Sequence, residues 1–354
     1  MQELIAAIHM HTRYSDGTGL HKDLADAGLA AGVDVLLVSD HNLLVQGMDG
    51  YYQKGKNRLL MLVGEELHDP TLREKGSHLL AFGHNQELSR YTREPQKLID
   101  QANLSGAVSF IAHPIDDPLT KFGEDEFSWR DWSVKSYTGI ELWNQFSEFK
   151  TRSQSLPKAA FHALFPNFMN QGPLPQTLQL WDRLLADSKQ PVVAIAGSDA
   201  HETIRAVGPF RVRLYPYQWQ FRTFATHLLT PSKLTGEINT DKSMVLDALR
   251  QGHAFCAFDL PHATKGFRFT CNNNDGTFIM GDRVQAKSGL TFQARLPIRT
   301  RVRLLKDGLV VKEHSDREVL TYLTKEPGIY RIEAYIDYLN RHRGWIFSNP
   351  IYAV

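Results

Sequence analysis

The chain has 354 residues, of which 42% are hydrophobic and 22% are charged, as in ordinary globular proteins and unlike disordered ones. Its 40 basic and 39 acidic side chains nearly cancel, which argues against nucleic acid and anionic membranes as partners, because both select basic surfaces. No apolar run approaches the roughly 20 residues that cross a bilayer, and the start at Met1-Gln2-Glu3 lacks the positive region of a signal peptide. We therefore expect a cytoplasmic protein that acts on a small molecule, with no membrane or nucleic-acid partner.

Strand-like and helix-like stretches alternate through the first two-thirds of the chain, which is the pattern of β/α units. The predicted helices are His21–Ala31, which ends at Gly32, Pro95–Asn103, Leu178–Asp187 and the short Met244–Arg250. The predicted strands are Leu4–Ile8, Val35–Ser39, Leu59–Val63, Leu79–Phe82, Val108–Ala112, Thr138–Trp143 and Val192–Ala196.

Residues 115–176 hold many aromatic side chains among prolines, amides and charged residues. Because this segment directly follows His113, one interpretation is that it covers a site and shapes a substrate pocket. The other interpretation is a satellite hydrophobic cluster that packs on the α/β core. The two interpretations are compatible, and the sequence leaves both open.

After Gly266 the pattern changes to alternating runs that turn sequences separate. The strands predicted here are Phe267–Thr270, Leu290–Leu296, Val302–Leu305 and Tyr330–Tyr335, which indicate a β-sandwich over residues 265–354. This region carries no metal-type cluster, so we expect a scaffold or a dimerisation module, and a homodimer is compatible with it. The two cysteines, Cys256 and Cys271, are too few for a disulfide framework and are interpreted as core residues.

Histidines and acids close five of the apolar runs. They are His9 and His11, Asp40-His41, Glu65-Glu66, His113 and Asp199-Ala200-His201. The carboxyl ends of parallel strands meet on one face of a barrel, where such folds build their sites. Imidazoles and carboxylates gathered at one point are ligands for divalent metals. The pattern predicts a multinuclear metallohydrolase.

The motifs, in chain order, are His9-Met10-His11-Thr12 with Ser15-Asp16-Gly17, Ser39-Asp40-His41-Asn42, Gly64-Glu65-Glu66 with Gly76-Ser77-His78-Leu79-Leu80, Ala112-His113-Pro114, and Gly197-Ser198-Asp199-Ala200-His201. Over residues 5–205 they resemble the PHP (polymerase and histidinol phosphatase) superfamily. The run Gly344–Ile351 resembles two-domain members with a β-rich tail, a branch that also contains carbamate and ester hydrolases. The resemblance implies an irregular (β/α)7 TIM-like barrel over residues 1–260, with residues 115–176 as an insertion, and a smaller C-terminal all-β sandwich domain over residues 265–354.

The resemblance also implies three metal positions, here called M1, M2 and M3. M1 takes His9, His11, Glu66 and Asp199; M2 takes Glu66 as a bridge with His78 and His113; M3 takes Asp16, His41 and His201. The family's bridging acid lies two residues after the glycine, which favours Glu66 over Glu65. Since alternate residues of a strand face opposite sides, Glu65 is expected to point outward as a surface residue. Asp40 is expected to orient an imidazole.

Imidazole and carboxylate ligands without thiolates admit Zn²⁺, Mn²⁺ and Fe²⁺ alike, so two or three such divalent ions are the predicted cofactors. They would deprotonate a bridging water and stabilise the developing anionic oxygens of the substrate. The predicted catalytic residues are His201, His41 and Asp199, with either histidine as general acid if M3 is empty. Arg13 and Arg205 are predicted to bind a substrate anion.

The leading hypothesis is a metal-dependent phosphoesterase that hydrolyses a small phosphomonoester or a cyclic or diester phosphate through a metal-bridged hydroxide. The alternative is a carbamate or carboxylic-ester hydrolase on the same metal site, which the tail and the aromatic segment favour. A third hypothesis is a non-catalytic binding module. An apolar pocket with no cation beyond the metals would favour the second hypothesis over the first.

Overall fold

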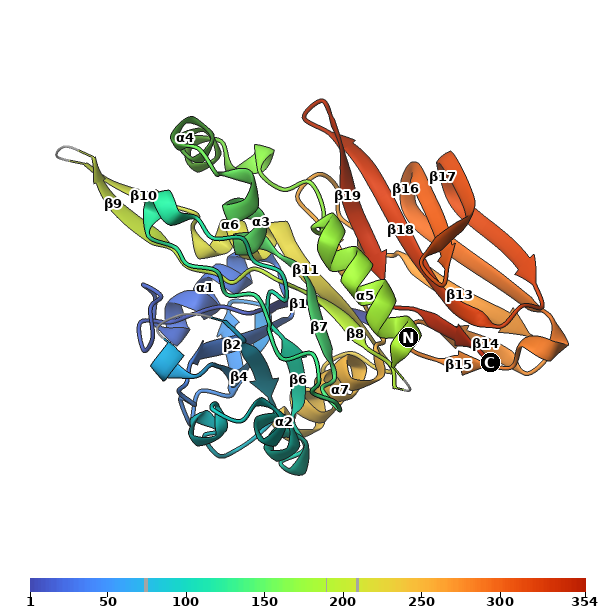
Figure 1. Ribbon diagram of the computed structural model, residues 1–354, viewed down its shortest axis with the longest axis horizontal. Helices are drawn as coiled ribbons and strands as arrows, with labels where there is room; N and C mark the ends of the chain where they lie inside the picture. The colour runs from blue at the N-terminus through green and yellow to red at the C-terminus, as the bar shows by residue number, and fades with distance from the viewer. Residues whose placement is uncertain (73–75, 189, 208–209) are drawn as a thin grey trace.

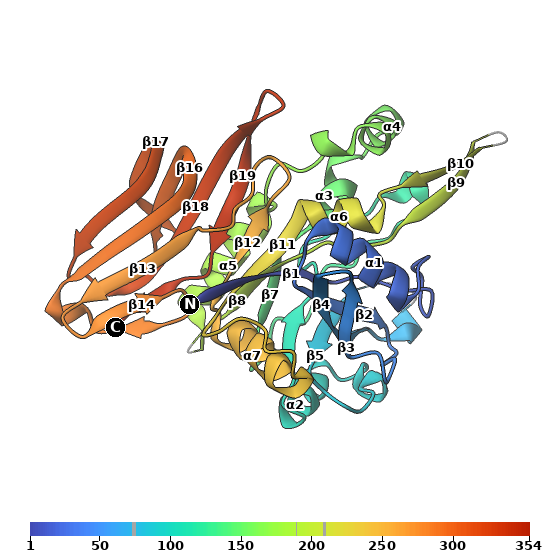
Figure 2. The ribbon, with the colours of Figure 1, turned by 180° about the vertical axis from the view of Figure 1, so that it is seen from behind.

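The structure of the chain is a computed structural model that describes residues 1–72, 76–188, 190–207 and 210–354, without the side chains of residues 204–207, 210–212 and 288. Its α/β part and its β-rich tail lie side by side (Figures 1 and 2). Among the described helices, none is long and apolar enough to cross a membrane.

The α/β part contains all the strands and helices that the sequence predicts for it. Its strands are β1 (Gln2–Ile8), β2 (Val35–His41), β3 (Gly50–Lys54), β4 (Asn57–Leu67), β5 (Leu79–Phe82), β6 (Val108–Ile111), β7 (Gly139–Asn144), β8 (Val193–Gly197), β9 (Thr203–Val207), β10 (Phe210–Leu214), β11 (Phe224–Thr230) and β12 (Ala254–Phe258). The helices are α1 (His21–Ala31), α2 (Pro95–Leu104), α3 (Gln145–Arg152), α4 (Leu156–Leu164), α5 (Pro175–Asp187), α6 (Tyr217–Thr223) and α7 (Ile238–Gln251).

Helix α1 illustrates how local sequence sets these elements. It ends at Gly32, whose φ of 81° lets its N–H bond the carbonyls of Gly28 and Leu29. Gly28 lies against Leu36 and Leu59, where an added Cβ would come within 3.0 Å of either side chain. The helix therefore packs closely on the strands that carry the site.

The sheet confirms a mixed α/β fold, but it differs from the predicted barrel in two respects. First, β5 runs antiparallel to both β4 and β6, because the link of residues 68–78 is too short for the crossover of about a dozen residues that parallel neighbours require. Second, the sheet is open: between β8 and β1 the described residues show only the isolated bridge Met10–Ala200 and bonds such as Ser198 N–H to the Ile8 carbonyl at 3.0 Å.

The tail is all-β in its described residues, apart from one short 3-10 turn. Its strands are β13 (Arg268–Asn273), β14 (Gly276–Ile279), β15 (Arg283–Val284), β16 (Leu290–Lys306), β17 (Leu309–Thr324), β18 (Gly328–Tyr338), β19 (Arg341–Ser348) and β20 (Ile351–Ala353). The two strands predicted within 290–305 form the single long strand β16. Since β12 pairs with β19, one hydrogen-bonded sheet runs through both parts. The domain limits and the sandwich stay predictions.

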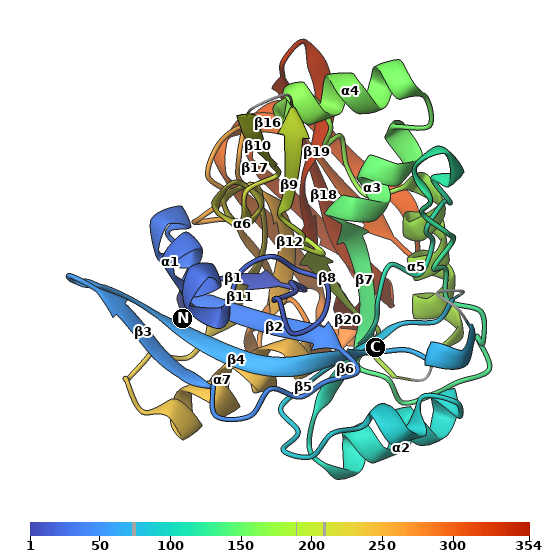
Figure 3. The same cartoon turned by 90° about the vertical axis from the view of Figure 1, so that its left-hand side faces the viewer.

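The segment 115–176 contains the sheet strand β7 as well as α3 and α4. Trp129, Val134 and Trp143 belong to a buried hydrophobic cluster with α2 and α5, which fits the interpretation as a packing cluster. Helices α3 and α4 and the β9–β10 hairpin project beyond the same end of the sheet (Figures 1 and 3). This second group lies over the strand ends.

The tail also holds the end of this segment in place. The buried Arg343 of β19 donates hydrogen bonds from Nη1 to the carbonyls of Asn167 at 3.0 Å and Asn170 at 2.5 Å. The next residue, Gly344, donates its N–H to the carbonyl of Gln171 at 2.7 Å. The chain between α4 and α5 is therefore bound to the tail through its backbone.

Candidate metal centre

Strand direction brings the predicted ligands to one edge of the sheet. His9 follows β1, His41 ends β2, Glu66 lies near the end of β4, His113 follows β6 and Asp199 follows β8. His78 precedes β5 instead, and because β5 is antiparallel its start lies at the same edge. The antiparallel strand thus supplies a ligand without disturbing the cluster.

Three of these residues have the left-handed backbone conformation that L side chains seldom adopt. The φ angles are 66° for His9, 25° for His113 and 49° for Asp199. Such conformations cost on the order of 1–3 kcal/mol each and persist where the surroundings enforce them. Here they turn the chain at the strand end, so that the side chains enter the centre.

The residues predicted for M1 form a compact buried group. His9 Nε2 lies 3.2 Å from Glu66 Oε2 and 3.4 Å from Asp199 Oδ1. His11 Nε2 lies 3.3 Å and 3.2 Å from the same two oxygens. One ligand atom from each of the four residues lies within 4.8 Å of the others, which is close enough for a single cation.

The other oxygen of Glu66 faces the residues predicted for M2. Glu66 Oε1 lies 2.8 Å from His78 Nδ1 and 3.0 Å from His113 Nε2. Glu66 therefore presents one oxygen to each group, as a bridging carboxylate does. Its pKa is held well below the usual range: burial opposes the charge, but His9, His41, His78 and the hydrogen bond from His113 outweigh it.

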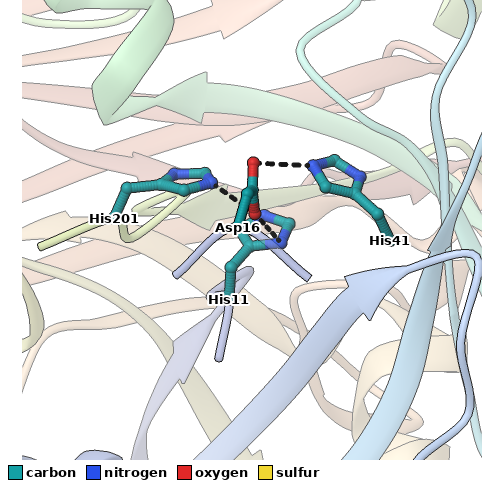
Figure 4. Close-up of side chains that lie close together, drawn as sticks. All are labelled: His11, Asp16, His41 and His201. Carbon is teal, nitrogen blue, oxygen red and sulfur yellow. Dashed lines mark ion pairs between the residues drawn. The ribbon is translucent and has the colours of Figure 1, made fainter. Parts of the chain in front are cut away.

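The residues predicted for M3 surround Asp16 (Figure 4). Its carboxylate lies 3.1 Å from His201 Nε2 and 3.4 Å from His41 Nε2. His11 joins this group as well, with Nδ1 3.6 Å from Asp16, while its Nε2 faces the M1 group. The Asp16 side chain is 52% exposed, so this is the most open of the three groups.

Charges within the cluster shift the imidazoles in opposite directions. Burial disfavours protonated His201, but the hydrogen bond and charge of Asp16 raise its pKa to about 9. Burial and the charges of His201 and His41 lower the pKa of His11 to about 4. Asp16 and Asp199 have pKa values far below the ordinary range, because hydrogen bonds and charges of the histidines overcome burial. All three carboxylates are ionised at neutral pH, as metal ligands must be.

Unpartnered atoms show that cations fit this centre. Buried polar atoms without any hydrogen-bond partner include His9 Nε2, both ring nitrogens of His11, His41 Nδ1, Glu66 Oε2, His78 Nε2 and His113 Nδ1. A buried polar atom without a partner costs about 1–3 kcal/mol, and proteins rarely concentrate such atoms. Divalent cations would satisfy them with the donor types that these metals bind.

Glu141 on β7 supports the centre, although the sequence interpretation did not include it. Its Oε1 lies 2.9 Å from His9 Nδ1, and its Oε2 accepts hydrogen bonds from the His113 N–H and Asn144 Nδ2, both at 2.8 Å. A carboxylate on the far nitrogen fixes the orientation of a ligand imidazole. The available signal was an acid inside the otherwise apolar run 138–143.

Glu65 corrects one expectation. It is fully buried rather than exposed, and its Oε2 lies 2.8 Å from His84 Nε2 and 3.0 Å from the Leu88 N–H, which donates to it. Alternation does place Glu65 on the face opposite Glu66, but β4 is covered on both faces. The face of β4 that carries Glu65 is therefore also buried.

Asp40 also differs from expectation, and the role predicted for the two arginines stays a prediction. Asp40 accepts hydrogen bonds from the N–H and Oγ1 of Thr12 and from Ser15 Oγ, each at 2.7 Å, so it holds the loop that carries Asp16 rather than an imidazole. Arg13 is exposed and is not among the described residues that line the cavity. Arg205 lies on β9, and its side chain is outside the described part of the chain.

A cavity of about 1160 Å³ opens above the cluster. The predicted ligands Asp16, His41, Glu66, His78, His113, Asp199 and His201 are among the residues that line it. Apolar side chains such as Phe127, Phe146 and Phe149 line much of the rest, together with the polar residues Gln145, Gln220, Glu124 and Glu202. None of the described lining residues is a lysine or an arginine.

No family model and no curated protein match the chain. A solved two-domain protein from Bacteroides vulgatus, containing a predicted PHP-like metal-dependent phosphoesterase, is 14% identical with a TM-score of 0.44 over 99% of this chain and 95% of that one. A Bifidobacterium adolescentis protein, whose assignment as a metal-dependent phosphoesterase is itself provisional, is 13% identical with a TM-score of 0.32 over 58% of this chain and 92% of that one. Since both TM-scores are below 0.5, the function has to be inferred from the residues of the centre.

Proposed function

We propose that the chain is a metal-dependent hydrolase of the PHP superfamily and that its substrates are phosphoesters. The observation that carries this proposal is Glu66, which presents one oxygen to His9 and His11 and the other to His78 and His113. The unpartnered buried atoms around it support two or three divalent cations, zinc, manganese or iron. Such ions supply an activated water and stabilise charge on the substrate oxygens.

The charge of the centre favours an anionic substrate. Glu66, Asp199 and Asp16 together supply three negative charges against the four positive charges of two divalent cations, and the imidazole ligands are neutral when they bind metal. The loaded centre keeps a net positive charge, which attracts a phosphate group even where no arginine or lysine side chain is described. The ions thus take the role predicted for Arg13 and Arg205.

His201 and His41 are the proposed proton carriers. Both line the cavity, and the Nδ1–H of His201 donates to the carbonyl of Asp199 at 2.9 Å, which leaves Nε2 directed at Asp16. Without a third ion, a protonated Nε2 is in position to donate to a leaving group. The proposed catalytic role of Asp199 is to keep a negative charge beside His9 and His11.

A carbamate or carboxylic-ester hydrolase is the second candidate. It is favoured by the apolar walls of the cavity and by the lack of a cationic side chain among the described lining residues. A neutral ester needs less charge compensation than a phosphate, so it would depend less on the exposed group around Asp16.

The test is to load the protein with Zn²⁺, Mn²⁺ or Fe²⁺, count ions by elemental analysis, and assay phenyl phosphate, bis(phenyl) phosphate, phenyl acetate and a phenyl carbamate in parallel. We expect at least two ions per chain and the highest kcat/KM on a phosphate. Hydrolysis of the acetate or carbamate alone would establish the second candidate instead. One ion or none in fully loaded protein contradicts the proposal.

A further inference from the structure

The cavity is larger than a small phosphoester requires. Its volume of about 1160 Å³ exceeds the range of about 300–1,000 Å³ that is usual for sites of drug-sized ligands. The predicted metal ligands form only part of its lining. The remaining space is large enough for a further part of the bound substrate.

A row of aromatic rings leads away from the metal centre. The ring of Phe146 lies 6.0 Å from that of His201, and Phe149 lies 6.2 Å from Phe146. Tyr215 follows at 5.5 Å from Phe149, and Trp219 at 5.8 Å from Tyr215. We call Phe146, Phe149, Tyr215 and Trp219 the aromatic wall. It offers a continuous apolar surface that starts beside a proposed proton carrier.

Helix α4 contributes small side chains to the same cavity. Ala159, Ala160 and Ala163 line it together with Leu156 at the start of the helix, whereas the larger Phe161 and Leu164 do not. Alanine at these positions leaves space between α4 and the rest of the cavity lining. This space would close if bulky residues stood there.

Two polar atoms in the apolar part have no partner. Gln145 is 2% exposed and lines the cavity, and its Oε1 is buried without a hydrogen bond. Its Nε2 contacts Asn170 Oδ1 at 3.4 Å, and Asn170 in turn donates Nδ2 to Glu148, which fixes the amide orientation and leaves Oε1 free. The Tyr215 hydroxyl is likewise buried and unpartnered. Buried acceptors are seldom left unpaired, so Gln145 indicates a donor on the ligand.

We propose, on the basis of the hydrolase function above, that the substrate is an ester with a bulky aromatic or alicyclic group that carries a hydrogen-bond donor. The scissile bond lies over Glu66, the apolar group lies between the aromatic wall and α4, and its N–H or O–H donates to Gln145 Oε1. Gln145 and Ala163 are specificity residues, and neither takes part in the chemical step.

The substrates for the test share nearly the same leaving-group acidity: phenyl phosphate, biphenyl-4-yl phosphate and 4′-hydroxybiphenyl-4-yl phosphate, each with its acetate counterpart. We expect kcat/KM to rise at least about tenfold from phenyl to biphenyl through apolar burial. The added hydroxyl should raise it a further three- to tenfold, which is the range of about one neutral hydrogen bond. Equal kcat/KM for phenyl and biphenyl esters overturns the proposal.

Three variants assign these gains to residues. Ala163→Phe should remove the biphenyl advantage, so that kcat/KM for biphenyl-4-yl phosphate is no higher than for phenyl phosphate. Gln145→Met, which keeps the length of the side chain, should remove only the hydroxyl advantage. The control is Leu164→Phe, since Leu164 is 71% exposed and lies outside the cavity lining. If Ala163→Phe lowers kcat/KM for all esters equally, the space beside α4 is not a substrate subsite.

Binding to the metal-free protein separates this proposal from the proposed function. The probes are 4-phenylphenol and 4,4′-dihydroxybiphenyl, measured by calorimetry. We expect both to bind, with a Kd at least tenfold higher in Ala163→Phe than in Leu164→Phe. If loaded protein hydrolyses no ester but this pattern holds, the hydrolase function fails and the apolar subsite stands. If esters are hydrolysed but neither phenol binds, the subsite proposal fails alone.

Discussion

Buried clusters of histidine and carboxylate lie at both ends of β1. At the start of the strand, His227 on β11 lies between Glu3, 2.7 Å from Nδ1, and Asp259, 2.8 Å from Nε2. At the other end lie His9, His11 and the rest of the candidate metal centre. Both clusters have residues of the same types, and His227, His9 and His11 are all fully buried.

The two clusters differ in how far their polar atoms are satisfied. Both ring nitrogens of His227 have carboxylate partners, and Glu3 Oε2 also accepts from the Gly266 N–H and from Arg268. In the candidate metal centre, several ring nitrogens and Glu66 Oε2 make no hydrogen bond, although three of these nitrogens lie only 3.1–3.3 Å from that oxygen. Residue types alone therefore do not distinguish a structural cluster from a ligand site. Buried polar atoms without a hydrogen bond do distinguish the two, because such atoms need a partner that the chain itself does not supply.

Removing Glu66, the proposed bridging acid, should produce the largest change in the candidate metal centre. For Glu66→Gln we expect hydrolysis to fall by more than about 1000-fold, since outer-shell partners alone are worth about 10–100-fold and Glu66 faces two groups. Elemental analysis should show a loss of bound metal at the same time. Full metal content with normal turnover would mean that the two oxygens do not bridge.

The matched control for that variant is Glu65→Gln. Glu65 is equally buried but contacts His84 and Leu88. The Glu65→Gln protein should therefore retain its bound metal and lose about 1–3 kcal/mol of unfolding free energy.

Removing His227 should affect stability without affecting metal. His227→Ala leaves Glu3 and Asp259 without their shared partner, which typically costs about 3–5 kcal/mol for a buried pair. Urea unfolding measures this loss, and metal content should not change. His253→Ala serves as the control, because its pair with Asp282 is partly exposed and such pairs are worth about 0–1 kcal/mol. A loss of metal from His227→Ala would contradict the separation of the clusters.

The His227 cluster should also respond to pH. Burial opposes protonation, but the charge of Asp259 and the hydrogen bonds to Asp259 and Glu3 raise the pKa of His227 to about 9. The unfolded value is about 6.5, so the stabilisation is fully present below that pH and disappears as pH rises through 9. The gap in unfolding free energy between wild type and His227→Ala should narrow by about 3 kcal/mol over this interval. A constant gap would show that His227 is neutral in the fold.

The smallest of these effects is expected for Glu141, which supports the candidate metal centre. Glu141→Gln keeps the size of the side chain but removes the charge beside His9 Nδ1, and such partners contribute about 10–100-fold to metal affinity. Competition with a chelator measures this affinity, with Glu318→Gln, on the exposed surface of β17, as the comparison. Unchanged affinity would assign Glu141 a packing role only.

The gathering of the predicted ligands could be foreseen because most of them follow or end a recognisable apolar strand, whereas His78 precedes one. Whether a residue lies at a strand end can be read from the local sequence. Because parallel strands end on the same side of the sheet, residues at their ends lie close together. Their role as ligands stays a prediction. Glu141 could not be identified in this way, since it lies within a strand and its meaning depends on the orientation of His9, which comes from a distant segment.

The errors have a common physical source, the tertiary surroundings of a strand. Alternation assigned Glu65 to the opposite face correctly, but only packing decides whether that face meets water. The antiparallel course of β5 depends on the length of one link, and the open sheet depends on contacts between β8 and β1. Neither is visible in the hydrophobic pattern of a single strand.

The backbone contacts between the tail and the segment after α4 have a consequence for how this chain can be recombined. Met169, which lines the cavity, lies between Asn167 and Asn170, whose carbonyls Arg343 holds. A chimera that exchanges the tail would keep every predicted metal ligand, yet it would alter the surface against which the substrate lies. Exchanging the tail therefore also changes the cavity. A tail grafted from another protein is expected to alter substrate preference while the predicted metal ligands stay the same.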